Sequence, residues 1–249
     1  MAGYNIIDKT SIVGPNCRMG AFIVISKNVK IGEGCVIGNN VVIYEGTVVG
    51  RGVRIDDNAV IGKQPMKAVN SAVTKAARQP PAHIGVGCII GAQAIIYAGA
   101  RLGKNVFIAD LASIREEVMI GDCTIVGRGT AIEPFTQIGS YCKIETNAYI
   151  TAYSHLEDYV FVGPGVVTSN DNFVGRTKER FKHYKGVVIK KGGRIGINCT
   201  ILPGKVIGED ALVAAGSLVT KDIPPRKIAM GCPAKVVKDV PKEQLLENQ

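Results

Sequence analysis

An aliphatic residue recurs at every sixth position over most of this chain, and this step constrains the fold more than any other feature. The hexads run without a break over residues 13–61, 84–162 and 189–219, with nine, fourteen and six members. A step of six fits neither the 3.6-residue period of a helix nor the two-residue alternation of a single strand. It predicts a solenoid, in which short strands point one large side chain inward and stack coil on coil.

The fifth position of the hexad is small, which indicates a tight space inside each coil. It holds Ala, Ser, Thr or Cys at many hexads, and five of the seven cysteines occupy it: Cys17, Cys35, Cys88, Cys142 and Cys199. Thirty glycines, no tryptophan and 6% aromatic residues also favour a core of small and branched aliphatic side chains. An odd number of cysteines without a CxxC pair predicts neither a disulfide framework nor a zinc cluster. We therefore expect these thiols to be small buried hydrophobic groups.

Two stretches interrupt the six-residue step. The first insert, residues 63–83, is "KQPMKAVNSAVTKAARQPPAH" and carries Lys63, Lys67, Lys75 and Arg78. The second insert, residues 169–187, begins "SNDNFVGRTKERFKHYKG" and is also basic. Insertions in a solenoid form loops on one face, which is often the binding face. We expect both inserts to be such loops, although plain surface decoration is the alternative.

The end of the chain loses the repeat. Pro224, Pro225, Pro233 and Pro241, which break helices and strand ladders, lie in or just before residues 226–249, and this segment ends in the short helical pattern "PKEQLLEN". Because the open end of a solenoid must be covered, we interpret this segment as a cap. The predicted domains are therefore a β-helix over residues 1–225 and a C-terminal capping extension over residues 226–249.

The charge narrows the class of ligand. A net charge of +9 and a pI near 9.2 suggest phosphorylated ligands or nucleic acid. Nucleic acid is disfavoured, because the basic residues gather in the inserts and the C-terminal segment and few aromatics are available for stacking on bases. No basic segment followed by an apolar run opens the chain, and no apolar stretch approaches the roughly 18 residues of a membrane span. We therefore expect a cytoplasmic protein with no membrane contact.

The repeats resemble those of the hexapeptide-repeat acyltransferases over residues 10 to 238. This resemblance implies an all-β fold, a left-handed parallel β-helix of about ten coils, whose handedness the period alone does not supply. Near the end, Thr220 to Pro225 match T-K-D-[IV]-P-P and Gly231, Pro233, Ala234 and Lys235 match G-x-P-A-K. Within the family these motifs are typical of enzymes that use acyl-coenzyme A.

The block around "VFVGPGVVTSNDNFVGR" is similar to the sugar-nucleotide N-acetyltransferases of this fold, and most similar to the dTDP-3-amino-3,6-dideoxyhexose N-acetyltransferases. The resemblance implies transfer of an acetyl group from acetyl-CoA to the 3-amino group of a dTDP- or UDP-linked amino sugar. It also implies a homotrimer with active sites in the grooves between subunits, and no metal.

The same resemblance supplies candidate site residues. Asn147 matches the asparagine beside the reacting amine and thioester. The other candidates fall into two groups, a sugar pocket with Tyr153, Asn170, Asp171 and Arg176, and a coenzyme site with Gly196 and Ala215 at the pantetheine arm and Lys221 and Lys235 near the phosphates.

Amine attack on a thioester requires loss of a proton from the amine and stabilisation of an oxyanion. Asn147 suits either a hydrogen bond to the amine or donation to the oxyanion, and a turn-forming role is its structural alternative. His155 is a candidate general base, since imidazole exchanges protons near neutral pH. A sugar amine is partly neutral at that pH, so His155 is equally well a pocket residue or a surface residue. His83 and His183 are expected to be structural and exposed, respectively.

Three other functions stay open at this stage. A metal hydrolyase of the carbonic anhydrase type needs about three converging histidines, and this chain has three, widely spaced. A non-catalytic β-helix would bind no coenzyme A. An O-acetyltransferase would keep the donor but accept a hydroxyl, which makes a general base more necessary.

Overall fold

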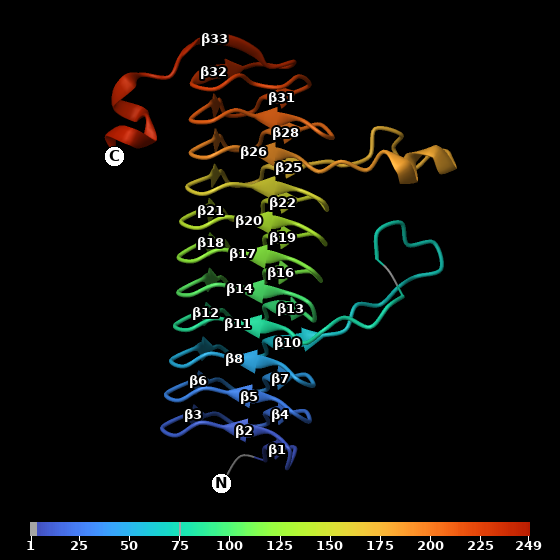
Figure 1. Ribbon diagram of the computed structural model, residues 1–249, viewed down its shortest axis with the longest axis vertical. Helices are drawn as coiled ribbons and strands as arrows, with labels where there is room; N and C mark the ends of the chain where they lie inside the picture. The colour runs from blue at the N-terminus through green and yellow to red at the C-terminus, as the bar shows by residue number, and fades with distance from the viewer. Residues whose placement is uncertain (1–3, 75) are drawn as a thin grey trace.

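The computed structural model describes residues 4–74 and 76–249, and it is a solenoid in which very short strands wind around one axis through three flat sheets (Figure 1). Each coil contributes one strand to sheet A, then one to sheet B and one to sheet C. In uninterrupted coils, equivalent residues are 18 positions apart and pair in register, as Ile96, Ile114 and Ile132 do. The predicted all-β parallel β-helix is confirmed.

The strands of the described residues form sheets of 11, 10 and 12 members. Sheet A contains β1 (Ile6–Ile7), β4 (Val24–Ile25), β7 (Val42–Ile43), β10 (Val60–Lys63), β13 (Ile95–Tyr97), β16 (Ser113–Ile114), β19 (Ala131–Ile132), β22 (Tyr149–Ile150), β25 (Val167–Thr168), β28 (Thr200–Ile201) and β31 (Leu218–Val219). Sheet B contains β2 (Ile12–Val13), β5 (Lys30–Ile31), β8 (Val48–Val49), β11 (His83–Ile84), β14 (Arg101–Leu102), β17 (Met119–Ile120), β20 (Gln137–Ile138), β23 (His155–Leu156), β26 (Val188–Ile189) and β29 (Val206–Ile207). Sheet C contains β3 (Arg18–Met19), β6 (Val36–Ile37), β9 (Arg54–Ile55), β12 (Ile89–Ile90), β15 (Phe107–Ile108), β18 (Ile125–Val126), β21 (Lys143–Ile144), β24 (Phe161–Val162), β27 (Arg194–Ile195), β30 (Leu212–Val213), β32 (Lys227–Met230) and β33 (Lys235–Asp239).

The core runs along the axis as stacked aliphatic side chains. Ile96, Ile114 and Ile132 are each 0% exposed, and the small fifth position fills the corners beside them. Cysteines 35, 88, 142 and 199 are buried there and Cys17 is half-buried, so the prediction of small buried groups is confirmed for those four. Burial raises the pKa of the Cys142 thiol to about 11, which keeps it protonated at neutral pH.

Two rungs lie outside the hexads counted from the sequence. Strand β1 precedes the first hexad, and β25 carries Thr168 at an inward position that is elsewhere aliphatic. The Thr168 hydroxyl accepts a hydrogen bond from the Thr151 N–H at 2.8 Å and donates one to the Tyr149 carbonyl at 3.1 Å. Because its polar group is satisfied, Thr168 continues the coil where the hydrophobic pattern predicts a break.

Both inserts leave the solenoid at the same corner. The first connects β10 to β11 and the second connects β25 to β26, so each passes from sheet A to sheet B. We call this edge the A–B corner, and the edge between a sheet C strand and the next sheet A strand the C–A corner. The two inserts project on one side of the molecule (Figure 1), and the second contains the 3-10 helix η1 (Lys178–Lys182). Lys75 of the first insert lies outside the described residues.

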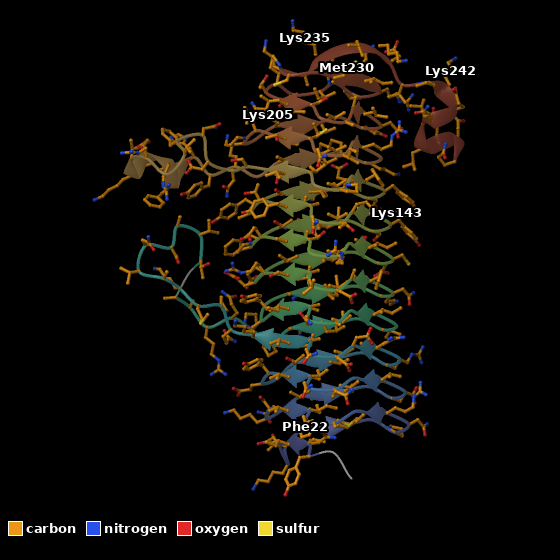
Figure 2. The ribbon with its side chains drawn as sticks, turned by 180° about the vertical axis from the view of Figure 1, so that it is seen from behind. Phe22, Lys143, Lys205, Met230, Lys235 and Lys242 are labelled. Carbon is orange, nitrogen blue, oxygen red and sulfur yellow. The ribbon has the colours of Figure 1, made fainter. Side chains whose placement is uncertain are left out.

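The C-terminal segment closes one end of the solenoid. Strand β32 extends sheet C parallel to β30, and β33 returns antiparallel to β32, a hairpin that the sequence pattern did not predict. Lys235 lies on this end, opposite Phe22 (Figure 2). The helical ending is present as two 3-10 turns, η2 (Lys242–Gln244) and η3 (Leu246–Asn248). The division into domains at residue 225 stays a prediction.

The inward and outward positions of one strand allow a matched test of this packing. Ile90 is fully buried, whereas its neighbour Ile89 in β12 is 42% exposed. We expect Ile90→Ala to lower the free energy of unfolding by about 3 kcal/mol, because it leaves a cavity in the core. We expect Ile89→Ala to lower it by less than about 1 kcal/mol. Urea denaturation followed by circular dichroism measures both, and equal losses would contradict the assignment of the inward face.

Candidate functional site

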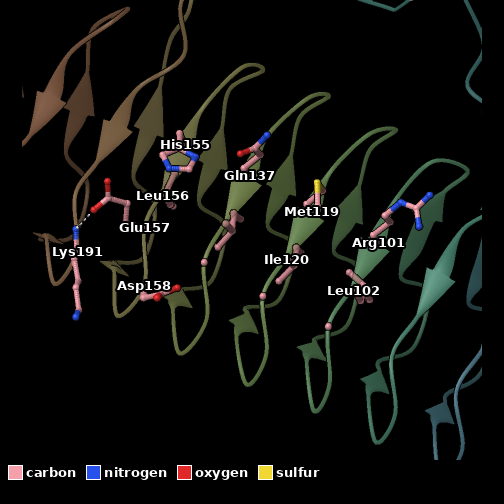
Figure 3. Close-up of a pocket in the computed structure, with 14 residues that line it drawn as sticks. Arg101, Leu102, Met119, Ile120, Gln137, His155, Leu156, Glu157, Asp158 and Lys191 are labelled. Atoms are coloured by element: carbon pink, nitrogen blue, oxygen red, sulfur yellow. Dashed lines mark hydrogen bonds between the residues drawn. The ribbon is translucent and has the colours of Figure 1, made fainter.

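A groove of about 630 Å³ runs across the outer face of sheet B. Strands β14, β17, β20 and β23 present Arg101, Met119, Gln137 and His155 in a row along it (Figure 3). Lys191 and Glu157 lie at one end, where Glu157 accepts a hydrogen bond from the Lys191 N–H at 2.9 Å. The groove therefore combines an apolar floor with several charged side chains.

Glu157 is committed to its lysine neighbours. Its carboxylate accepts a hydrogen bond from the Lys190 ammonium at 2.8 Å. This bond is the main reason that the pKa of Glu157 is lowered, and the Lys191 N–H adds to it against the opposing effect of desolvation. Glu157 is thus an ionised group that fixes the end of the groove, and it is unsuited to proton transfer.

His155 is the predicted site residue that faces this groove. Its side chain is exposed on β23, with Gln137 on one side and Val188 on the other. Among the described residues its imidazole makes no hydrogen bond that would fix a tautomer. The position suits a pocket residue, and whether His155 accepts a proton stays a prediction.

A second, smaller groove of about 240 Å³ lies on sheet C and contains both residues predicted for the pantetheine arm. Gly196 and Ala215 line it with Phe161, Arg194 and Leu212 among others. A Cβ on Gly196 would lie 2.6 Å from the Ala215 nitrogen, so successive coils approach closely only because residue 196 is glycine. The groove is narrow and largely apolar, as a thin aliphatic chain with amide groups requires.

Asn147 lies at the C–A corner, in the left-handed conformation that recurs at the fourth hexad position, with φ 58°. Its N–H donates to the Arg128 carbonyl at 2.9 Å. Its side-chain oxygen lies over Gly129, 2.5 Å from the place that a Cβ would take there. These contacts give Asn147 a turn-forming role. They also separate it from His155, which follows the next corner.

Of the predicted sugar-pocket residues, Tyr153 lies at the A–B corner, and Asn170, Asp171 and Arg176 belong to the second insert, which leaves the solenoid at that corner. Tyr153 stacks on Phe135 with ring centroids 5.3 Å apart. Asp171 accepts hydrogen bonds from the N–H groups of Phe173 (2.8 Å) and Gly175 (3.0 Å) and pairs with Arg180 at 3.2 Å.

Although desolvation opposes them, these backbone hydrogen bonds and Arg180 hold the pKa of Asp171 below its ordinary value. Its carboxylate therefore shapes the insert. Asn170 is half-buried and Arg176 is exposed, while Lys221 and Lys235 are exposed near the C-terminal end of the solenoid.

A charged cluster at the A–B corner is absent from the sequence-based candidates. We define the corner cluster as Tyr97, Arg115, Glu116 and Glu133. Arg115 makes two hydrogen bonds to the buried Glu116, at 2.8 and 3.1 Å, and lies 3.7 Å from Glu133. It also packs over the Tyr97 ring, with 4.9 Å from guanidinium to centroid, and donates to Thr74 of the first insert at 3.0 Å. The cluster thus anchors the first insert to the coils.

A sequence signal for this cluster exists. The residue after the inward aliphatic one is usually glycine in sheets B and C, because a Cβ there would meet the next coil. At Gly85, for example, an added Cβ would lie 1.9 Å from the Gly103 carbonyl oxygen. On three successive rungs of sheet A the same position holds Tyr97, Arg115 and Glu133. Large side chains fit there because the A–B corner is the one that opens into the inserts. A run of non-glycine residues in one column marks a corner with room for side chains.

The three histidines do not converge in one chain. His83 and His155 lie on β11 and β23, four rungs apart on sheet B, which is about 19 Å at the usual spacing between strands. His183 lies in the second insert, where it contacts Glu179 at 3.2 Å and the Phe173 ring. Burial, with Arg101 nearby, lowers the pKa of His83. A three-histidine metal site is therefore not formed by one copy of this chain.

No helix in the described part of the chain has the length and apolar character to cross a membrane.

Two family models match parts of the repeat region. The model of the bacterial transferase hexapeptide (six repeats) matches residues 10–45 and 28–63. The model of the hexapeptide repeat of succinyl-transferase matches residues 81–109 and 186–221.

Curated relatives match over parts of their length. Bifunctional protein GlmU of Rubrobacter xylanophilus is 41% identical over 80 residues, which is 32% of this chain and 15% of that protein. The dTDP-3-amino-3,6-dideoxy-alpha-D-galactopyranose 3-N-acetyltransferase of Aneurinibacillus thermoaerophilus is 51% identical over 49 residues, 20% of this chain and 26% of that protein. The matches therefore span less than a third of either relative.

Among solved structures, LpxA from Bacteroides fragilis, a UDP-N-acetylglucosamine acyltransferase, aligns with 96% of this chain and 74% of its own. Its TM-score is 0.54 at 20% identity, so the likeness is one of fold. The matched repeats, the 18-residue register and this fold agree with one another. The chain therefore carries hexapeptide repeats similar to those of bacterial transferases, on a parallel β-helix fold.

Proposed function

We propose that this protein is an N-acetyltransferase that moves an acetyl group from acetyl-CoA to the 3-amino group of a dTDP- or UDP-linked amino deoxy sugar. The 51% identical segment shared with an N-acetyltransferase of a dTDP-linked 3-amino sugar carries this proposal. The coenzyme A motifs at residues 220–225 and 231–235 support the choice of donor.

The sheet C groove and the A–B corner are the proposed places for the two substrates. The sheet C groove, with Gly196 and Ala215, suits the pantetheine arm because it is narrow and apolar and lies between close backbones. Lys221 and Lys235 are exposed near the same end of the solenoid, where they are available to phosphates. The second insert and the corner cluster offer polar side chains for a sugar at the A–B corner.

The residues proposed for the donor and those proposed for the sugar lie on different corners of the solenoid. Asn147, Gly196 and Ala215 belong to the C–A corner, and Tyr153, Asn170, Asp171 and Arg176 belong to the A–B corner. One copy does not bring them together across the face of sheet A. A homotrimer with its sites between subunits would pair one edge with the other edge of a neighbour, and we include this assembly in the proposal.

The reaction joins an amine nitrogen to the thioester carbonyl carbon. A donor near the carbonyl oxygen stabilises the oxyanion, and the collapse of the tetrahedral intermediate breaks the C–S bond. Asn147 is the proposed amide beside these atoms, and His155 is a proposed base or pocket residue.

A panel of acceptors tests the proposal. Purified protein is incubated with acetyl-CoA and dTDP- or UDP-linked 3-amino, 4-amino and matching 3-hydroxy sugars, and free thiol is followed. We expect turnover with a 3-amino sugar at least about tenfold above that with the matching 3-hydroxy sugar, because the amine is the better nucleophile at neutral pH. Thiol release with the hydroxy sugars alone would assign O-acetyl transfer, and release with none would refute the proposal.

The donor groove has a matched pair of variants. Ala215→Leu places a larger side chain in the sheet C groove, and we expect it to raise KM for acetyl-CoA about tenfold, the equivalent of roughly 1.4 kcal/mol. Ala92→Leu makes the same change at the equivalent hexad position of an earlier sheet C coil, outside the groove, and should leave KM unchanged. Equal values of KM for both variants and the wild type would place the donor elsewhere.

His155→Asn separates the two roles of the histidine. We expect the variant to change KM for the sugar nucleotide by no more than about tenfold and to leave the shape of the pH–rate profile unaltered, as a groove residue would. The measurement is kcat and kcat/KM from pH 5.5 to 9. Loss of the acidic limb of the profile would show instead that His155 is the general base.

A further inference from the structure

We propose that the corner cluster is the subsite for the acceptor amine and that Glu133 is the carboxylate that takes the proton from it. This inference rests on the proposed function and adds a catalytic residue to it. Among the charged groups of the cluster, Glu133 is the most weakly paired, because Arg115 and Glu116 are hydrogen-bonded to each other.

Arg115 pairs more strongly with Glu116 than with Glu133. Glu116 is 1% exposed and holds Arg115 through two hydrogen bonds. The guanidinium also donates a hydrogen bond to the Thr74 hydroxyl of the first insert, at 3.0 Å. Glu133 is left with an ion-pair contact of 3.7 Å, too long for a hydrogen bond. Within residues 4–74 and 76–249, no donor is hydrogen-bonded to the Glu133 carboxylate.

Glu133 is nevertheless largely withdrawn from solvent. Its side chain is 24% exposed, and the outward neighbours on β19 and β16 are the small residues Ala131 and Ser113. A half-buried carboxylate without a hydrogen-bond donor is costly, and a ligand that supplies N–H groups would relieve that cost. An ammonium group supplies three such donors and a compensating charge.

The charges around Glu133 suit a proton acceptor. Burial raises the pKa of its carboxyl group, the neighbouring Glu116 raises it further, and Arg115 opposes both. Tyr149 on the next rung has a phenol whose pKa is also raised, by burial and by Glu133, so it is neutral. The Lys63 ammonium is directed to the Tyr97 ring, 5.6 Å from its centroid. Because the pKa of the Glu133 carboxyl group is raised, it lies closer to the pKa of an amine, which favours proton transfer between the two groups.

The position agrees with the proposed sugar pocket. Glu133, Thr151 and Ser169 follow the inward residues of β19, β22 and β25, so they form one column along the A–B corner. Two rungs separate Glu133 from Ser169, about 10 Å at the usual strand spacing, and Asn170 comes next in the chain. One pyranose ring with its substituents bridges such a separation.

The sugar ammonium gives one proton to Glu133, which becomes a neutral acid, and the freed nitrogen pair forms the C–N bond to the thioester carbon. The carbonyl pair moves to oxygen and returns as the C–S bond breaks. The departing sulfur takes the second ammonium proton, so the products are the amide and CoA thiol, and Glu133 releases its proton to water.

The test compares Glu133→Gln with Glu117→Gln, the same change at a neighbouring half-buried position of the same corner. We expect Glu133→Gln to lower kcat/KM for the amino sugar by about 10²–10⁴-fold at pH 7. Its activity should recover as the pH rises through the pKa of the sugar amine, because solvent then supplies the neutral nucleophile. The control should retain wild-type kcat/KM and the wild-type profile.

Thermal denaturation guards against a folding defect. Because the ionised Glu133 is disfavoured by its surroundings, the neutral amide should leave Tm unchanged or raise it at pH 7.5. A large fall in Tm together with lost activity would assign Glu133 a structural role and overturn the inference. So would an active Glu133→Gln enzyme with a wild-type pH profile, although the proposed function would then stand. A wild-type protein inactive on the whole acceptor panel would overturn both.

Discussion

The backbone hydrogen bonds between successive coils are the constraint on which the rest of the structure depends. Each strand of about two residues pairs in parallel with the strands one coil before and after it. For example, the Ile95 N–H donates to the Ala112 carbonyl and the Ser113 N–H donates to the Thr130 carbonyl, both at 2.9 Å. These bonds fix the rise between coils at the spacing of neighbouring strands. Every side chain that points inward must then fit a layer of that height, which explains the aliphatic first position and the small fifth position.

The same spacing decides where functional side chains are allowed. Along sheets B and C, the residue after the inward aliphatic one lies so close to the next coil that glycine dominates, as Gly85 and Gly196 show. The A–B corner is relaxed because two coils open there into long inserts. Large and charged residues therefore accumulate at that corner, in the corner cluster and around the second insert.

The unequal pairing inside the corner cluster links this architecture to chemistry. Arg115 has enough donors for Glu116, for Thr74 and for a weaker contact to Glu133, and its fixed planar geometry favours the first of these. Anchoring the first insert and leaving one carboxylate free are thus two results of the same arrangement. The proposed acceptor site at this corner and the proposed donor groove at the C–A corner are on separate edges, which gives a physical reason for an assembly of several copies.

The sequence alone determined the solenoid, its core and the points at which the two inserts leave. A six-residue step repeats in every coil, and the aliphatic first position of each hexad marks the residue that points into the core. It also located residues such as Gly196 and Ala215, which the fold brings into one groove. It did not determine the rung at Thr168, since a satisfied hydroxyl replaces an aliphatic group there, nor the C-terminal hairpin, which has no repeat. Only the tertiary structure decided that residues 63–83 and 169–187 emerge at one corner, and that Thr74, Arg115, Glu116 and Glu133 meet there. Such contacts depend on how far each coil rotates and on where a loop folds back against the coils. A local pattern of residues predicts neither of these.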